Sequence, residues 1–308
     1  MKYLKYLNEY LEFCKTQKQL DHKTLKAYKT DIRQFLLSES CNIVFKIDGK
    51  IIESYFTSIN SRYTSKTLKR KFASIKSFFK YLEYKHKIKH NPFNNVFIKF
   101  KLQKQLPKVI PLNIIEKLLS TTYTELSNAK NKYKQHYILR DIAIIELLFA
   151  TGMRISELCN LKTSSINLNE GKIFITGKRN KERIISICNN KIINILKECY
   201  LAFHSNSTVH NDFYFIKHDG SKLSEQFVRR TIYRCTAKLN TNHKITPHMF
   251  RHTFATCLLD SGVDIRYIQE LLGHSSINVT EIYTHVSTSK QKEILINNHP
   301  RNNFDFNF

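Results

Sequence analysis

The chain has 308 residues and a formal net charge of +25, from 50 Lys and Arg against 25 Asp and Glu. With 42% hydrophobic and 12% aromatic residues, it holds enough apolar material for a packed core, which excludes a wholly disordered chain. So large a positive charge argues against an ordinary enzyme of a small neutral substrate. It indicates a polyanionic partner, with nucleic acid as the first candidate.

Nothing in the sequence predicts export, membrane insertion or metal binding. The start, MKYLKYLNEYLEFCK, has neither a continuous apolar run nor a small-residue cleavage site, so no signal peptide is expected. The apolar run at 142–150 is short and contains Glu146, so no membrane span is expected. Seven scattered cysteines without a CxxC pair predict reduced thiols in a cytoplasmic protein, not disulfides or a zinc site.

The first 100 residues predict an all-helical domain. Apolar residues recur there at helical spacing, and candidate cap residues precede two of the runs. The expected helices cover Lys2–Lys15, a segment that begins at Asp21 or Thr24, Lys50–Ser58, and a long segment after Thr64. Residues 1–110 carry a net charge of +16, and the remaining residues carry +9. The amino-terminal part is therefore expected to be a folded basic domain.

One face of the long helix after Thr64 is strongly basic. Its cations are Lys66, Lys69, Arg70, Lys76 and Lys80. A solvated charged face is the ordinary interpretation, but Glu83 is the one acid between Lys66 and Lys89. Because the face lacks neutralising acids along the helix, we predict that it contacts DNA phosphates.

A polar, basic stretch at 101–111 is expected to link two domains, residues 1–100 and 112–308. The second domain is predicted to be α+β, so that the whole chain is mainly α with a small β-hairpin. Its expected elements, in order, are a helix at Leu112–Ser120, a loop or extended helix end at 121–137, a helix at Leu139–Ala150, a hairpin of Gly171–Thr176 and Arg183–Ile187, helices near 191–203 and 224–239, a helix capped by Thr246 and begun by Pro247, a helix at Asp264–Leu272, and a last pair of helices around Tyr283. The tail residues Phe304, Phe306 and Phe308 are expected to be exposed and to dock on another copy of the chain.

Several polar residues of the second domain have ordinary explanations when each is taken alone. His248 and Arg251 share a helix face near a helix start, where a solvated pair is common although the backbone N–H groups also favour an anion. Arg154 has Glu157 within reach three residues on, and Lys178 lies in a hairpin turn where an exposed lysine is expected.

Taken together in order and spacing, the segments ATGMRISEL, TGKRNKERI, TPHMFRHTFAT and LLGHSSINVTEIYTHV strongly resemble the tyrosine recombinase (phage-integrase) superfamily. Lys178 follows Arg154 by 24 residues, His274 follows Arg251 by 23, and Tyr283 follows His274 by 9. Among its members, the chain is most similar to bacterial Xer-type site-specific recombinases. The resemblance is close from residue 139 to about 300 and looser over residues 1–110, which are similar to the family's SAM-like core-binding domain.

The resemblance implies a catalytic role for six residues. Tyr283 would be the nucleophile that forms a 3′-phosphotyrosyl link. A phenol with a pKa near 10 is a poor nucleophile unless its proton is removed or its oxyanion is stabilised, and the resemblance implies that His248 assists the proton transfer. The remaining assignments are Arg154 and Arg251 as phosphate clamps, His274 as a further donor to the phosphate, and Lys178 as the general acid for the leaving 5′-oxygen.

The same resemblance implies double-stranded DNA with specific recombination sites as the partner, and a homotetramer, or a heterotetramer with a second recombinase, acting on two such sites. No cofactor, metal or membrane is expected, and the protein is expected to work on the nucleoid. The residues leave open whether it resolves chromosome dimers or moves a genetic element. Two other classes remain as alternatives: a type IB topoisomerase, which would relax DNA by similar chemistry, and a non-catalytic DNA-binding accessory protein.

Overall fold

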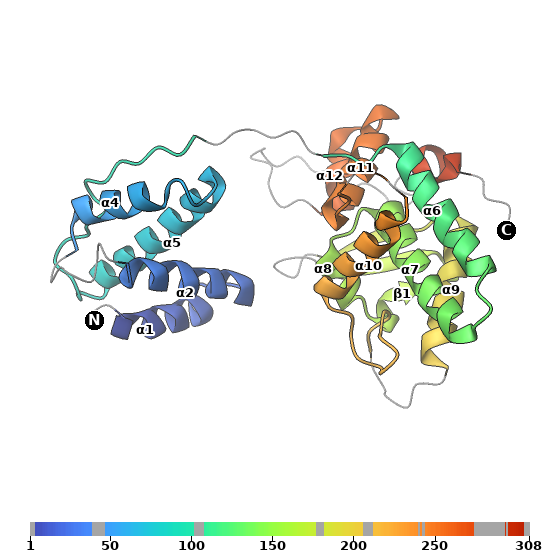
Figure 1. Cartoon of the computed structure of the whole chain (residues 1–308), viewed down its shortest axis with the longest axis horizontal. Coiled ribbons are helices and arrows are strands. Elements are labelled where there is room, and N and C mark those ends of the chain that lie inside the picture. The colour runs from blue at the N-terminus through green and yellow to red at the C-terminus, as the bar shows by residue number, and fades with distance from the viewer. Residues whose placement is uncertain are drawn as a thin grey trace. The chain divides into compact units, whose positions relative to one another are not determined.

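The computed structural model describes residues 4–38, 47–101, 108–176, 182–205, 212–239, 241, 244–273, 293 and 295–304. The chain divides into two compact units, Met1–Gln105 and Leu106–Phe308 (Figure 1). Helices dominate both, and the described strands form one three-stranded antiparallel sheet in the second unit. The predicted fold class, mainly α with a small sheet, is therefore confirmed. Within the described residues, none of the helices combines the length and apolar character needed to cross a bilayer.

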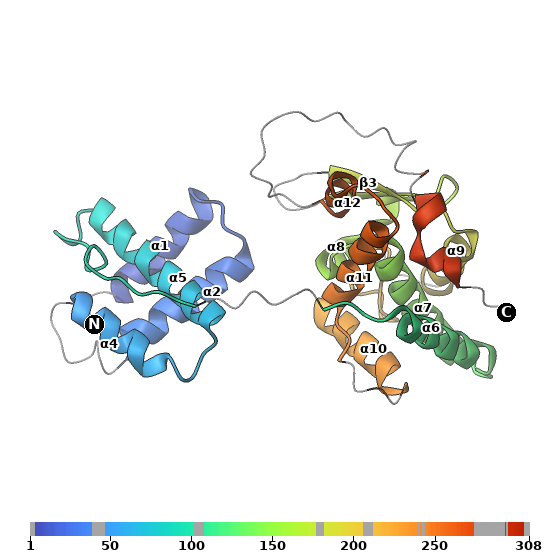
Figure 2. The ribbon, with the colours of Figure 1, turned by 90° about the horizontal axis from the view of Figure 1, so that it is seen from above.

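The first unit is a helical bundle. Its described helices are α1 (Leu4–Thr16), α2 (His22–Leu36), α4 (Gly49–Ile59) and α5 (Ser65–Tyr84). Helices α1, α2 and α5 pack on one another (Figure 2) around the buried rings of Tyr10, Phe35 and Phe78. Of the two cap candidates, Asp21 caps α2, because its side chain accepts the backbone N–H of Thr24.

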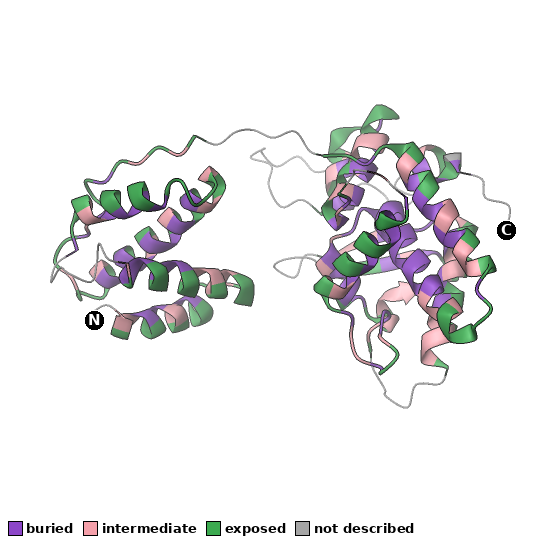
Figure 3. Ribbon diagram, viewed as in Figure 1, coloured by how far each residue is buried: buried purple, intermediate pink, exposed green. Residues whose placement is uncertain are grey.

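A long buried helix organises the second unit. Its described elements are α6 (Leu112–Ser127), α7 (Lys132–Thr151), α8 (Ile155–Asn160), η1 (Thr163–Ser165), β1 (Ile166–Asn167), β2 (Lys172–Thr176), β3 (Glu182–Ser186), α9 (Asn190–His204), α10 (Glu225–Ala237), α11 (Pro247–Asp260), α12 (Ile265–Leu272) and η3 (Pro300–Asn303). Every residue of α7 from 138 to 151 is buried, and α6, α9, α10 and α11 surround it (Figure 3). The end of α7 is thus held from several sides, directly before Arg154.

Of the two alternatives for 121–137, the extended helix end is confirmed as far as Ser127, where α6 ends. Helix α7 already begins at Lys132, so most of this segment is helical. Its polar composition hid a buried face, on which the Tyr123 hydroxyl donates to Glu146 at 2.9 Å. Thr246 stands at the N-cap position of α11, but its side chain makes no capping hydrogen bond. The short elements α8 and β1 were not expected from the sequence.

The predicted hairpin is confirmed as strands β2 and β3, with Ile173 opposite Ile185 and Ile175 opposite Arg183. The turn at 177–181 lies outside the described residues, as do most of the expected linker and the expected helices around Tyr283.

The predicted exposure of the tail is wrong for Phe304. This side chain is buried and stacks on Phe149 of α7, with ring centroids 5.9 Å apart. Phe306 and Phe308 lie outside the described residues. Because Phe304 packs on its own chain, it is not an exposed anchor for a neighbouring copy.

Candidate active site

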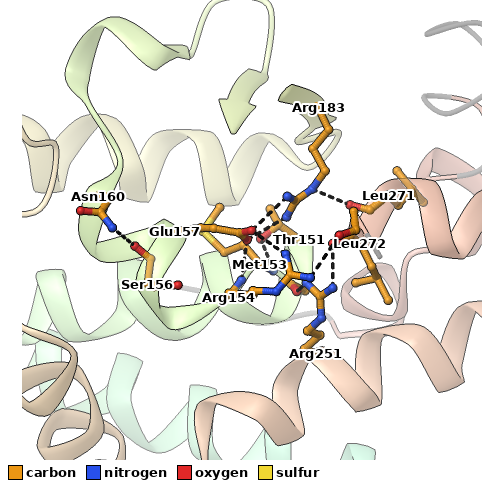
Figure 4. Close-up of polar contacts among 12 residues, drawn as sticks. Thr151, Met153, Arg154, Ser156, Glu157, Asn160, Arg183, Arg251, Leu271 and Leu272 are labelled. Carbon is orange, nitrogen blue, oxygen red and sulfur yellow. Dashed lines mark hydrogen bonds and ion pairs between the residues drawn. The ribbon is translucent and has the colours of Figure 1, made fainter. Parts of the chain in front are cut away.

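The structure describes three of the six predicted catalytic residues: Arg154, His248 and Arg251. Lys178, His274 and Tyr283 lie outside the described residues. Arg154 and Arg251 come together at the carboxyl end of α12, although they are 97 positions apart in the chain (Figure 4). His248 is exposed in the first turn of α11, one turn before Arg251.

A glycine turn positions Arg154. Gly152 caps the carboxyl end of α7 with a φ of +57°, and a Cβ at this position would meet the ring of Phe254 at 2.7 Å. Glycine is therefore the residue that fits both the left-handed conformation and the close approach. The chain then turns into α8 with Arg154 as its N-cap residue. The Arg154 N–H donates to Glu157 Oε2 at 2.7 Å, and its guanidinium donates to Glu157 Oε1 at 2.8 Å.

Arg251 is almost fully buried, with 6% of the residue exposed. Its guanidinium donates to the carbonyls of Gly152 at 2.9 Å and Leu272 at 2.7 Å. Burial, together with the positive charges of Arg154 and Arg183, lowers the pKa of Arg251 to about 9. The Arg251 guanidinium therefore stays charged at neutral pH, and a bound anion would reduce the free-energy cost of burying this charge.

Arg183 of β3 is a third arginine of this cluster, and the sequence analysis missed it. Its Nε donates to the Leu271 carbonyl at 2.9 Å, and its terminal nitrogens donate to the two oxygens of Glu157 at 3.1 and 2.8 Å. A signal was present, because Arg183 shares a strand face with Ile185 and Ile187, which are both buried. A charged residue on the core face of a strand requires a buried partner.

The three arginines form hydrogen bonds with the carbonyls at the carboxyl end of α12. Arg183, Arg251 and Arg154 donate, in that order, to the successive carbonyls of Leu271, Leu272 and Gly273, the last at 3.1 Å. The last carbonyls of a helix lack partners within it and carry a partial negative charge, so guanidinium groups satisfy and stabilise this end. The residue after Gly273 is His274, so the stretch of sequence that carries His274 and Tyr283 follows directly on this cluster.

Glu157 is the one carboxylate that contacts the arginine cluster among the described residues. Burial alone would raise its pKa, but the hydrogen bonds and charges of Arg183 and Arg154 outweigh burial and lower the pKa. Three guanidiniums and one carboxylate give a local charge of +2. Such a partly buried, hydrogen-bonded cluster is suited to an oxyanion, above all to a phosphate. Among the described residues, no group of His, Cys, Asp or Glu side chains is arranged as metal ligands would be.

The segment from His299 to Phe304 packs against α7 and stabilises its carboxyl end. Arg301 donates to both oxygens of Glu146 at 2.9 to 3.0 Å, and both residues are at most 1% exposed. His299 Nε2 lies 2.8 Å from the carbonyl of Ala150, four residues before Arg154. This segment therefore bonds directly to the helix end that leads into the arginine cluster.

The predicted DNA-binding face lies on α5 of the first unit. All five of its cations, Lys66, Lys69, Arg70, Lys76 and Lys80, are exposed. Arg70, however, forms an ion pair with Asp31 of α2, which also binds the buried Lys71 at 3.2 Å. The acid that neutralises part of this face comes from another helix, which the charge pattern along α5 did not reveal.

Known proteins resemble both units. Residues 114–290 match the model of the phage integrase family, and residues 7–86 match the phage integrase N-terminal SAM-like domain. A tyrosine recombinase of Agathobacter rectalis is 52% identical over 301 residues, covering 98% of each chain. The tyrosine recombinase XerD of Listeria monocytogenes is 34% identical, covering 96% of this chain and 98% of its own. The structure of the XerH recombinase bound to palindromic difH substrate matches with a TM-score of 0.69 and 22% identity, over 94% of this chain and 81% of that one.

Proposed function

The chain belongs to the phage integrase family of tyrosine recombinases, and from this membership we propose that it cuts and rejoins duplex DNA at specific sites through a 3′-phosphotyrosyl intermediate. The observation that carries the proposal is the cluster of Arg154, Arg183 and Arg251 around Glu157 at the end of α12. It is a site for one phosphate, on the segments that match the family.

Arg154 and Arg251 hold the two non-bridging oxygens of the scissile phosphate. Negative charge builds on these oxygens in the transition state, so fixed guanidinium donors stabilise it more than the ground state. The carbonyls of Gly152, Leu272 and Gly273 orient both groups before DNA arrives. Little reorganisation is then needed at the moment of reaction.

The remaining roles follow the family motif. Tyr283 Oη forms a bond to phosphorus while the bond from phosphorus to the 5′-oxygen breaks. The phenol proton passes to His248, Lys178 gives a proton to the leaving oxygen, and His274 donates a hydrogen bond to the phosphate. Rejoining is the reverse attack by a 5′-hydroxyl, so the bond energy is kept in the phosphotyrosyl link and no external energy source is needed.

Strand exchange between two duplexes requires four cleavages, one on each strand, and each copy carries one Tyr283. We therefore propose that four copies act on two recombination sites, either as a homotetramer or with a second recombinase supplying half of them. The basic face of α5 adds phosphate contacts that do not depend on sequence. Because chromosomal or mobile-element DNA is the substrate, the proposed place of action is the cytoplasm, at the nucleoid.

A suicide DNA substrate, nicked so that the 5′-hydroxyl fragment diffuses away after cleavage, tests the chemistry. The wild type should accumulate a covalent adduct that resists denaturation, and Tyr283→Phe should form none. Exchange of strands between two labelled sites separates a recombinase from a topoisomerase, which would relax supercoils without pairing sites. Binding without any adduct, including on the host's own recombination sites, would leave only an accessory DNA-binding role.

A further inference from the structure

We propose that Arg183 is a positioning residue for the cleavage reaction, which holds Glu157 and the end of α12 so that Arg154 presents its guanidinium to the scissile phosphate. The inference rests on the proposed function. It assigns a role to a residue of β3 that lies outside the six positions of the family motif.

Arg183 and Arg154 share one carboxylate. Oε1 of Glu157 accepts from Arg154 at 2.8 Å and from Arg183 at 3.1 Å. Oε2 accepts from the Arg154 backbone N–H at 2.7 Å and from Arg183 at 2.8 Å. Each oxygen is therefore held from two sides, and the carboxylate has little freedom to rotate.

The loss of Arg183 would change both the geometry and the charge that Arg154 experiences. Glu157 would keep Arg154 as its one guanidinium partner, and the local charge of the cluster would fall from +2 to +1. An unshared carboxylate favours a bidentate pair with the nearest guanidinium. Arg154 would then turn toward Glu157 and away from the phosphate, and its charge would be more fully neutralised.

Arg183 also sets the position of the end of α12. It bonds to the Leu271 carbonyl, and a Cβ at Gly273 would lie 2.9 Å from its guanidinium nitrogen. The guanidinium therefore packs against the backbone of Gly273, whose carbonyl accepts from Arg154. The side chain itself is only 10% exposed, so this contact is sheltered from solvent. One residue thus fixes both partners of the Arg154 side chain, Glu157 and Gly273.

The alternative is that Arg183 merely stabilises the fold. The two roles differ in how they depend on the charge of the scissile phosphate. A positioning role acts through the clamp on a negatively charged non-bridging oxygen. A stabilising role acts equally on every substrate. Replacement of that oxygen by a methyl group, as a methylphosphonate, removes the charge and distinguishes the two.

The experiment compares Arg183→Ala and Arg183→Lys with the wild type. The matched control is Arg229→Ala, which breaks the ion pair of the exposed Arg229 with Glu225 on α10. On a normal suicide substrate, adduct formation by Arg183→Ala should slow about 100-fold, as expected for an angstrom-scale misplacement, while DNA affinity stays within about threefold. Arg183→Lys keeps the charge but not the fork, so it should slow the reaction about 10-fold.

On the methylphosphonate isomer that removes the clamped oxygen, the wild type and both Arg183 variants should cleave at rates within about threefold. An equal loss on both substrates, or a wild-type rate on the normal substrate, would overturn the inference while leaving the proposed function intact. Arg183→Lys serves as the test if Arg183→Ala fails to fold. If the wild type forms no adduct at all, the proposed function fails, and this inference fails with it.

Discussion

Acid should destabilise the second unit through His299, a buried residue that the structure holds in one protonation state. Its Nδ1 accepts the backbone N–H of Arg301 at 3.0 Å, so its Nε2 carries the proton and donates to the Ala150 carbonyl. A second proton would have to be placed on Nδ1, against an N–H group. Burial, to a greater extent than the nearby Arg301 charge, lowers the pKa of His299 from 6.5 to about 4.

The size of the effect follows from that shift. Unfolded chains bind the proton more readily, so the stability that His299 contributes is complete above pH 6.5 and is lost as the pH falls toward 4. With pKa values of 6.5 unfolded and about 4 folded, the free energy of unfolding should fall by about 1.4 kcal/mol at pH 5.5 and about 2.6 kcal/mol at pH 4.5.

Urea unfolding of the wild type and His299→Asn at pH 7.5, 6.5, 5.5 and 4.5 measures this contribution. Asparagine still accepts at the N-cap of η3, so the variant keeps the turn but removes the titrating group. Carboxylates titrate alike in both proteins, so the difference between the two pH profiles isolates His299. Parallel profiles between pH 6.5 and 4.5 would refute the reasoning, because they would show that the imidazole binds its proton equally well in both states.

Three further predictions concern charged residues. Arg251→Ala should leave DNA affinity within a few-fold but slow adduct formation at least about 100-fold, because a lost clamp donor costs roughly 3 kcal/mol; a near-normal rate would contradict the role. Lys69→Gln should lower the slope of log affinity against log salt concentration by about one unit, and Arg70→Gln should lower it by less, because Arg70 already pairs with an acid of α2. DNA-binding titrations at several salt concentrations measure these slopes, and unchanged slopes would indicate that the basic face of α5 is only solvated. Arg301→Met should destabilise the second unit by about 3–5 kcal/mol, because it removes the ion-pair partner of the buried Glu146, and adding Glu146→Gln should recover part of that loss. Urea unfolding of the single and double variants measures both effects, and an Arg301→Met variant as stable as the wild type would contradict them.

The fold class followed from the sequence because the strongest signals are local. Helical spacing, the Asp21 cap and the β2–β3 hairpin depend on residues close together in the chain. The polar stretch at 121–137 left a loop and a helix end as alternatives, because hydropathy does not show that Tyr123 finds a buried partner 23 residues away. Phe304 misled for a similar reason, since its partner Phe149 lies on another helix.

The site was only partly accessible from the sequence. Arg154 and Arg251 were found because a motif at known spacing places them. Arg183 was missed, because its place on a buried strand face indicates that it has a partner but does not show that the partners are Glu157 and a helix end 88 residues away. The motif names residues predicted to contact the phosphate, whereas the contacts that orient those residues become visible when the strands, turns and helix ends meet in three dimensions.

The arginine cluster explains how such basic residues are held close together before DNA is bound. Like charges repel, and two of the three guanidiniums are largely buried, which is costly without partners. The end of α12 supplies three carbonyls and the negative pole of the helix, and Glu157 supplies one full charge. The negative charge does not fully compensate the positive charge, because one carboxylate faces three guanidinium groups. A phosphate that enters the cluster would supply the missing negative charge, so the imbalance that makes the unbound cluster costly also favours binding of the phosphodiester that the protein is proposed to cleave.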